Sequence, residues 1–298
     1  MVSRPFHADP VLPAAEHDRG GPAFGENHRA AITAIHPLTA TEKLYQLRII
    51  DPEARRNFSF RPGQFVMLEL PGIGEAPFSI SSSPLRHGDI ELCIRAVGDL
   101  TNFLGRVPPG TVVGLSGPFG TSFPMERMEN GDLLLIAGGL GLAPLRAPIF
   151  SVLENRFLYK RIDIIYGAKN PEDLLFRYQY DTWRQFDIGL HLIVDRADAA
   201  WQGPVGLITD VLRQRLTATP DLSRDCFAIV CGPPVMFRSV CDLLIRAGMP
   251  MERIFVSLER RMHCGRGKCC RCNIGSTYTC LKGPVFDYWS VLNMKEAI

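Results

Sequence analysis

A change of hydrophobic pattern near residue 130 divides this sequence into two parts that require different folds. From residue 132 onward, apolar runs alternate with amphipathic stretches; the runs are 132–139, 161–168, 190–194, 226–232 and 253–258. Apolar runs that alternate with helical segments indicate strands buried on both faces between layers of helices. The pattern therefore predicts a doubly wound α/β domain with a parallel sheet of about five strands over residues 127–258.

Residues 30–126 carry a different pattern, in which short apolar segments are separated by turn residues. The expected strands are 44–50, 64–70, 78–83, 89–97 and 111–117, with turn sequences such as RPG (61–63) and PPG (108–110) between them. Closely spaced strands of this kind are typical of antiparallel barrels and sandwiches. We therefore predict an antiparallel β-barrel ahead of the α/β domain.

The two ends of the chain fit neither pattern. Residues 1–29 contain acids and prolines but no apolar segment typical of a secretory signal, so they are predicted to form a flexible extension. Residues 259–298 have too few apolar residues for a core of their own and are expected to need a staple such as a metal. A net charge of +2 argues against a polyanion-binding surface, and no apolar run approaches the roughly 20 residues of a membrane span. We expect a cytoplasmic protein without disulfides.

Five of the nine cysteines lie in the stretch HCGRGKCCRCNIGSTYTC (263–280). Four of them, Cys264, Cys269, Cys272 and Cys280, have the spacing C-x4-C-x2-C-x7-C, which matches plant-type [2Fe–2S] proteins. Cys270 lies between two of these candidate ligands and is expected to point away. A zinc site is the main alternative, although four-cysteine zinc sites normally contain two short C-x2–4-C pairs. A disulfide or a redox-active thiol is the least favoured interpretation, and His263 is expected to face solvent or support the ligands.

A glycine-rich turn joins the first strand of the α/β domain to its first helix. Gly138, Gly139 and Gly141 allow the backbone to turn tightly, and a helix that begins near Pro144 would present free N–H groups to a pyrophosphate. A purely structural tight turn is the alternative. The segment CGPPVM (231–236) follows the fourth strand, so it would lie at the same edge of the sheet, where ligands bind in folds of this class.

The order of the motifs RPGQFVML, EAPFSISSSP, AVGDLTNFL, AGGLGLAP and CGPPVM resembles that of the ferredoxin–NADP reductase-like flavoproteins. The tail ERRMHCGRGKCCRC…CLKGPVF is similar to the iron–sulfur end of two branches of that family. One branch is the gamma (diaphorase) subunit of cytoplasmic NiFe hydrogenases and sulfhydrogenases, and the other is the electron-transfer subunit of dihydroorotate dehydrogenase. The segments LERRMHCGRGKC and CLKGPVF favour the hydrogenase branch. The resemblance implies a flavin-binding barrel, an NAD(P)-binding domain and a cluster module at 259–298.

The resemblance also assigns roles to residues by position. It places Pro77, Phe78 and Ser79 beside the flavin ring, with the Ser79 hydroxyl toward flavin N5, and the backbone around Gly98, Leu100 and Thr101 on the flavin phosphates. It places Gly138, Gly139, Gly141 and Pro144 on the pyrophosphate of the nicotinamide nucleotide. It places Cys231, Gly232, Pro233 and Met236 beside the nicotinamide. Ser79 and Cys231 are the expected catalytic positions, acting by positioning and not as covalent catalysts. Ala76 replaces the arginine that pairs with the flavin phosphate in this family, which leaves FMN open beside FAD.

The function implied is electron transfer between NAD(P)H and a partner enzyme through FAD and a [2Fe–2S] cluster. A flavin can exchange hydride with nicotinamide and single electrons with a cluster, so no catalytic base or nucleophile is needed. The expected partner is a NiFe hydrogenase with a further iron–sulfur subunit. The alternatives are an electron-transfer subunit of dihydroorotate dehydrogenase or anaerobic sulfite reductase, or a nucleotide-binding protein without turnover that carries a zinc-stapled tail. Lys169 and Arg196 could contact a 2′-phosphate or could simply be solvated, so NAD and NADP both remain open.

Overall fold

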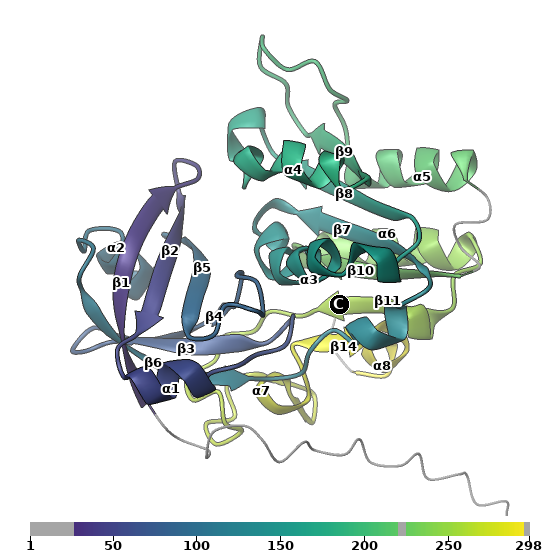
Figure 1. The fold of residues 1–298 in the computed structure, drawn as a ribbon. Coiled ribbons are helices and arrows are strands. Elements are labelled where there is room, and N and C mark those ends of the chain that lie inside the picture. Colours follow the sequence, from purple (N-terminus) through teal and green to yellow (C-terminus); the bar gives the residue numbers. More distant parts are fainter. Residues whose placement is uncertain (1–26, 220–224, 295–298) are drawn as a thin grey trace, which may run out of the picture.

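The computed structural model describes residues 27–219 and 225–294, so most of the predicted N-terminal extension lies outside the described residues. Two six-stranded sheets form the fold (Figure 1). The first sheet has the strand order β4-β3-β6-β1-β2-β5 and is antiparallel throughout. Its strands are β1 (Asn27–Pro37), β2 (Glu42–Ile49), β3 (Phe65–Leu70), β4 (Gly74–Ser79), β5 (Asp89–Arg95) and β6 (Val112–Phe119). Two short helices, α1 (Pro52–Asn57) and α2 (Asp99–Leu104), accompany them.

The two edge strands of this sheet, β4 and β5, meet and close it into a barrel. They meet within residues 78–83, where the sequence pattern predicted a single strand. Strand β4 instead ends at Ser79, and the following residues cross to β5. Ile80 forms a bridge with Leu92, and the Ser81 N–H donates to the Glu91 carbonyl at 2.8 Å. The predicted barrel is therefore confirmed, and the crossing explains why the strand is displaced. Strand β1 was missed: it begins at Asn27, within the segment assigned to the extension, and its small alanines give a weak apolar alternation.

The second sheet has the order β14-β11-β10-β7-β8-β9, with a parallel core from β11 to β9. Its parallel strands are β7 (Asp132–Gly138), β8 (Ile162–Ala168), β9 (Ile188–Val194), β10 (Cys226–Cys231) and β11 (Ile254–Ser257). Alternate residues of β7 face opposite cores, Leu133 and Leu135 toward one and Leu134 and Ile136 toward the other. Helices α3 (Leu142–Glu154) and α4 (Tyr180–Gln185) cover the first face, and α5 (Ile208–Ala218) and α6 (Pro234–Arg246) cover the second. This is the predicted doubly wound arrangement.

The sixth strand, β14 (Val285–Asp287), comes from the cysteine-rich tail and pairs antiparallel with β11. The rest of the described tail contains the small hairpin β12 (Asn273–Ile274) and β13 (Thr277–Tyr278), and the helices α7 (Thr279–Lys282) and α8 (Tyr288–Leu292). Ile274, Phe286 and Tyr288 pack in the core of the α/β domain. The tail therefore overcomes its shortage of apolar residues by sharing a neighbour's core, which the sequence pattern did not predict.

Helix α3 joins the α/β domain to the barrel through a buried polar network. The Ser81 hydroxyl donates to the Ala143 carbonyl at 2.9 Å, and Arg146 forms an ion pair with Glu91 at 2.5 Å. Arg146 is only 3% exposed, and its guanidinium lies over the rings of Phe150 and Phe176. These contacts fix α3 and the glycine turn before it against the barrel. None of the helices in the described ranges is both long and apolar enough to cross a membrane.

Candidate functional site

The glycine turn and the CGPPVM segment meet at the carboxyl edge of the parallel sheet. Strands β7 and β10 are neighbours, with Ala137 paired to Cys231. A Cβ added at Gly138 would lie 2.8 Å from the Met236 sulfur, and one at Gly141 would overlap the Cys231 carbonyl. A short 3-10 turn (Gly139–Gly141) leads directly into α3, which begins at Leu142, two residues before Pro144.

This close approach explains why glycine occupies these positions. Gly139 has a φ of +53°, which disfavours most side chains, and no Cβ blocks access to the backbone N–H groups at the start of α3. A turn that combines bare backbone with a helix N-terminus fits a pyrophosphate. The structure thus brings together the residues that the sequence assigned to one nucleotide: Gly138, Gly139, Gly141, Pro144, Cys231, Gly232, Pro233 and Met236.

The Cys231 thiol is fully buried at the end of β10. It is 1% exposed and forms a hydrogen bond with Ser257 on β11. Burial raises the pKa of this thiol far above its ordinary value, because the thiolate would lose its hydration. The side chain is therefore a neutral thiol at physiological pH, a state that suits positioning and not nucleophilic attack.

The barrel residues assigned to the flavin lie on the edge strand β4 and on α2, and these two elements are in contact. Pro77, Phe78 and Ser79 are half-buried, so the edge strand keeps part of its surface accessible. At the start of α2 the Thr101 hydroxyl accepts hydrogen bonds from the N–H groups of Val97 and Gly98, both at 2.9 Å. Leu100 and Phe78 pack against the same barrel core. Thr101 also lines a hollow of about 270 Å³ with Lys43 and Arg106.

Arg95 is a candidate that the sequence interpretation did not include. It ends β5, forms an ion pair with the buried carboxylate of Glu42, and lies about 4.0 Å from where a Gly139 side chain would begin. Burial alone would raise the pKa of Glu42, but hydrogen bonds from Thr39 and Arg95 lower it below its ordinary value. The carboxylate therefore stays ionised and holds the Arg95 guanidinium. A basic residue three positions before Gly98 was the available signal, but only the fold brings it to the glycine turn.

The four spaced cysteines form two pairs of neighbouring thiols. Cys264 contacts Cys269, and Cys272 contacts Cys280, through side-chain hydrogen bonds. Within the part of the chain that the structure describes, no three His, Cys, Asp or Glu side chains gather around a single ion position. The Gly267 N–H donates to Cys280 at 3.1 Å, and the Arg266 and Lys268 N–H groups donate to Cys264 at 3.4 Å each. Four thiols with N–H donors aimed at their sulfurs fit an iron–sulfur cluster.

Cys270 has a separate environment. Its φ is +58°, its side chain is exposed, and its sulfur lies 3.3 Å from the Tyr278 hydroxyl. His263 is also exposed. Both residues therefore lie outside the two thiol pairs.

One cysteine pair packs against β3, the strand next to the candidate flavin strand β4. Cys272 and Cys280 are each 2% exposed and share a small core with Phe65 and Met67 of β3. Phe65 pairs with Ser79 across the β3–β4 ladder, and opposed residues of an antiparallel pair project to the same face. Phe65 therefore neighbours both Ser79 and two of the thiols. The module also bonds to the barrel through its backbone, since the Thr121 N–H donates to the Gly283 carbonyl at 2.7 Å.

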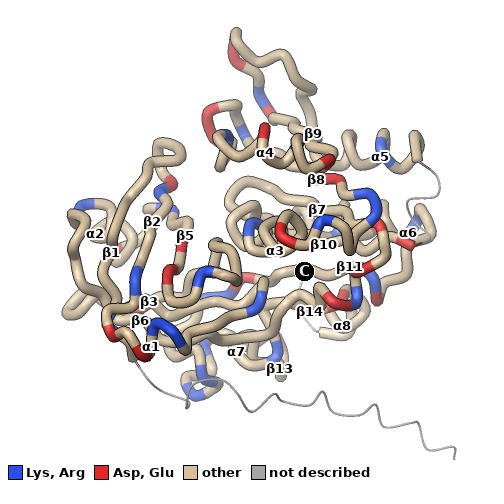
Figure 2. The backbone as a smooth tube through the Cα atoms, in the orientation of Figure 1, with Lys and Arg blue, Asp and Glu red and all other residues tan. Residues whose placement is uncertain are grey.

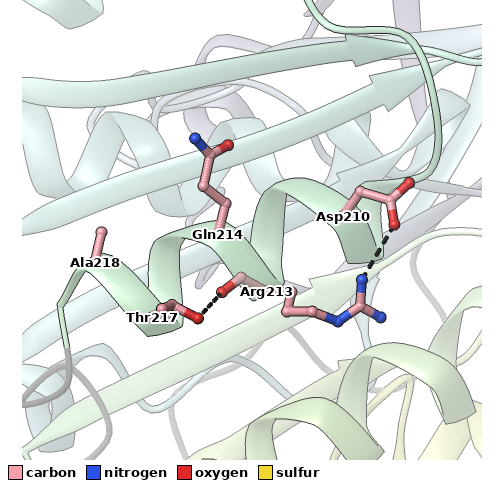
Figure 3. A pocket seen from close by; sticks show the side chains of 5 residues that line it. All are labelled: Asp210, Arg213, Gln214, Thr217 and Ala218. Atoms are coloured by element: carbon pink, nitrogen blue, oxygen red, sulfur yellow. Dashed lines mark hydrogen bonds and ion pairs between the residues drawn. The ribbon is translucent and has the colours of Figure 1, made fainter.

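Two other surface features lie outside the candidate cofactor sites described above. Lys169 and Arg196 follow β8 and β9, and the Arg196 N–H donates to the Lys169 carbonyl at 2.9 Å, so their loops are adjacent. A shallow hollow on α5 is lined by Asp210, Arg213, Gln214, Thr217 and Ala218 (Figure 3). Within it Arg213 pairs with Asp210 at 3.3 Å, and it contains none of the residues assigned to a ligand.

Three family profiles match consecutive parts of the chain. The oxidoreductase FAD-binding domain matches residues 30–123, the oxidoreductase NAD-binding domain residues 135–242, and the iron–sulfur cluster binding domain of dihydroorotate dehydrogenase B residues 259–292. FAD, a nicotinamide nucleotide and an iron–sulfur cluster are therefore the cofactors of this chain, which confirms the cofactor classes predicted from its sequence.

Similar proteins cover nearly the same length. The gamma subunit of sulfhydrogenase 1 from Pyrococcus furiosus is 40% identical, over 89% of this chain and 92% of that protein. A probable electron-transfer subunit of dihydroorotate dehydrogenase B (NAD(+)) from the same organism is 32% identical, over 78% of this chain and 82% of that protein. The structure of an NADH-dependent reduced ferredoxin–NADP oxidoreductase matches 92% of this chain and 94% of its own, with a TM-score of 0.67 and 24% identity, so it shows the fold alone.

The sequence resemblance and the predicted fold class are thus confirmed. The chain is an NAD(P)H oxidoreductase and belongs to the family of iron–sulfur flavoproteins that includes the sulfhydrogenase gamma subunits and the electron-transfer subunits of dihydroorotate dehydrogenase.

Proposed function

We propose that this chain is the subunit that carries electrons between NAD(P)H and a cytoplasmic NiFe hydrogenase, by way of FAD and a [2Fe–2S] cluster. The observation that carries the proposal is the packing of Cys272 and Cys280 against Phe65, which lies opposite Ser79. Phe65 is thus a neighbour of both the candidate flavin residue and the candidate cluster ligands, which supports a short path between the two cofactors. Electron transfer between bound cofactors needs such proximity and no catalytic acid or base.

The domain division supports one cofactor for each part of the chain. We assign the barrel to FAD over residues 30–126, with β1 adding residues 27–29, the α/β domain to the nucleotide over 127–258, and the tail from 259 to the cluster. When bound, FAD exchanges hydride with the nicotinamide and single electrons with the cluster. The protein supplies position: Ser79 toward the flavin ring, and Met236 and Cys231 against the nicotinamide. The N–H groups of the glycine turn hold the pyrophosphate.

The two thiol pairs support a [2Fe–2S] cluster in preference to zinc. Each iron of such a cluster takes two thiolates from the protein, so two separated pairs match its requirement, whereas a zinc ion needs four ligands around one point. Pairing of Cys264 with Cys269 and of Cys272 with Cys280 follows this pattern.

Anaerobic titration of the purified protein with NADH tests the cofactor chain. We expect flavin absorption and broad visible iron–sulfur absorption to bleach together. An electron paramagnetic resonance signal of a reduced [2Fe–2S] cluster should appear at the same time. A colourless protein that holds one zinc ion would refute the proposal and support the zinc-stapled nucleotide-binding protein.

The hydrogenase assignment rests on the greater likeness to the sulfhydrogenase subunit, 40% against 32% identity over a longer match. Isolation of the untagged protein from its native cells, followed by mass spectrometry of the copurifying subunits, tests it. Nickel–iron hydrogenase and iron–sulfur subunits should be recovered. Recovery of a dihydroorotate dehydrogenase would instead establish the second candidate, whose electron-transfer subunits share the same cluster-domain profile.

A further inference from the structure

The cysteine module concentrates positive charge beyond what the rest of the chain carries. Residues 260–286 contain no Asp or Glu and six basic residues: Arg260, Arg261, Arg266, Lys268, Arg271 and Lys282. The whole chain has 33 basic and 31 acidic residues, a net charge of +2, so everything outside this stretch carries 2 − 6 = −4. Figure 2 shows basic positions clustered along the edge of the molecule near α7 and β13.

Much of this charge faces solvent. Arg261, Lys268, Arg271 and Lys282 are exposed, and among the described residues none of these four side chains forms an ion pair. Arg266 instead lies over the Phe119 ring, and Glu75 of β4 is the acid that faces it. Lys268 and Lys282 follow Gly267 and Leu281, which lie against each other, and Arg271 follows Cys270, which contacts Tyr278, so the three residues come from one part of the module. We call these three residues the basic rim.

The cluster ligands alone do not account for this charge. A [2Fe–2S] cluster with four thiolates has a formal charge of about −2 when oxidised. This is smaller than the +4 carried by the four exposed basic side chains alone. Charges that face water, and not the thiols, act on molecules that approach the surface.

The two thiol pairs also differ in exposure. Cys272 and Cys280 are buried against the barrel, whereas Cys264 and Cys269 are partly exposed. Lys268 of the basic rim directly precedes Cys269, and its N–H donates to Cys264 at 3.4 Å. The exposed Leu281, at 43%, adds an apolar contact beside the rim. A partly exposed redox site, an apolar residue and a ring of cations make up a surface suited to a protein with a redox centre of its own.

We propose that the basic rim docks an acidic electron-carrying protein beside the Cys264–Cys269 pair, so that electrons cross between the two proteins on that side. The proposal rests on the proposed function, because it takes the cluster as the outlet for electrons. It goes further by naming the surface and the charge of the partner. Complementary charge acts mainly on the rate of encounter and is weakened by salt.

The preference of the basic rim for an acidic partner can be measured directly with two test proteins of about equal size and opposite charge. Cytochrome c is basic, and succinylation of its lysines makes it acidic without replacing the haem. Using the oxidised holoprotein at low ionic strength, we expect the succinylated form to bind about tenfold or more tightly than the native form. The difference should disappear in about 0.5 M salt, where the screening length falls to a few ångströms.

The variant Lys268→Glu/Arg271→Glu/Lys282→Glu should reverse this preference while retaining its flavin and cluster absorption. The matched control is Arg184→Glu/Arg213→Glu/Arg238→Glu, which makes the same change of net charge on exposed positions of the α/β domain. It should bind like the unmodified protein. Equal binding of both cytochromes, or an equal effect of both triple variants, would overturn the proposal.

Two further measurements separate the possible outcomes. Rates of NADH-driven reduction of the two cytochromes should follow the order of binding. If NADH bleaches the cluster normally but the rim variant changes nothing, the docking proposal fails and the proposed function stands. If neither NADH nor NADPH bleaches the cluster, the proposed function fails. Tighter binding of a short DNA duplex than of succinylated cytochrome c would also refute an acidic protein as the occupant.

Discussion

Cys270 and Cys272 lie two positions apart, but the backbone gives their thiols opposite surroundings. Cys272 is buried against Phe65, whereas Cys270 adopts a positive φ and contacts Tyr278 at the surface. The left-handed conformation at Cys270 turns its side chain out of the loop that presents the other four thiols. The cysteine spacing predicted Cys272 as a cluster ligand and Cys270 as a non-ligand. The backbone conformation at Cys270 gives a physical reason for this difference.

Replacing each of these two cysteines by serine gives a direct test. Cys270→Ser should retain iron and visible cluster absorption, because only a surface contact is lost. Cys272→Ser should lose both, since a serine hydroxyl is a poor replacement for a thiolate on iron. Iron content per protein and visible spectra measure the outcome, with flavin content as the check on folding. Loss of iron from Cys270→Ser alone would mean that the ligand set is wrong.

Gly141 is a second position where a single added carbon atom would disturb the site. A methyl group there would overlap the Cys231 carbonyl and so separate the ends of β7 and β10. We expect Gly141→Ala to weaken NADH binding by about tenfold or more, while flavin and cluster absorption remain. Gly72→Ala is the control: no atom lies within 4 Å of the added carbon, so its φ of +79° strains the alanine locally without disturbing the ends of β7 and β10. Fluorescence or calorimetric titration with the nucleotide distinguishes the two variants.

Strands β8 and β9 and helix α5 are joined by a buried carboxylate away from the ligand edge. Asp163 accepts from His191 at 2.8 Å and from Arg215 at 3.0 Å. Burial would raise the pKa of Asp163, but these hydrogen bonds and charges lower it below its ordinary value. A lowered carboxyl pKa stabilises the fold above the unfolded pKa of about 3.9, and this stabilisation is lost as pH falls through the folded pKa.

Asp163→Asn should therefore lower the free energy of unfolding by about 2 kcal/mol near neutral pH. The difference from the unmodified protein should narrow below about pH 4, where the unfolded carboxyl takes up its proton, and disappear below the lower folded pKa. Denaturant unfolding at several pH values measures it. Asp181→Asn, whose carboxylate is exposed beside Arg184, should have little effect at any pH. A difference that stayed constant down to pH 3 would contradict this account.

The three parts of the molecule could be predicted from the sequence to different extents. Periodicity predicted the barrel and the doubly wound sheet, because both are set by which side chains alternate between core and solvent. The cysteine spacing predicted the ligand candidates for the same local reason. Strand β14 pairs with β11, about 30 positions earlier in the chain, and Cys272 shares a core with Phe65, about 200 positions earlier. Both contacts depend on tertiary packing, and no local pattern contains that information. Arg95 was missed for the same reason.

The contact between Arg146 and Glu91 determines how the two large domains are held together. Both side chains are almost fully buried, one on α3 and the other on β5, and Arg146 also donates to the Ser81 carbonyl at 2.9 Å. Removing one partner of such a pair leaves the other charge buried without compensation, which costs about 3–5 kcal/mol. Because α3 begins at the glycine turn, loosening this contact also shifts the nucleotide site relative to the flavin strand.

Arg146→Met should thus lower the Tm by about 6 °C or more and slow flavin bleaching by NADH in stopped-flow measurements. Glu91→Gln should have a smaller effect, since the amide still accepts a hydrogen bond. The double variant should be less impaired than the sum of the two single variants, because no buried charge is left unpaired. Additive losses would show that the pair does not act as a unit. A large loss of stability with an unchanged bleaching rate would mean that it holds the domains without positioning the nucleotide for hydride transfer.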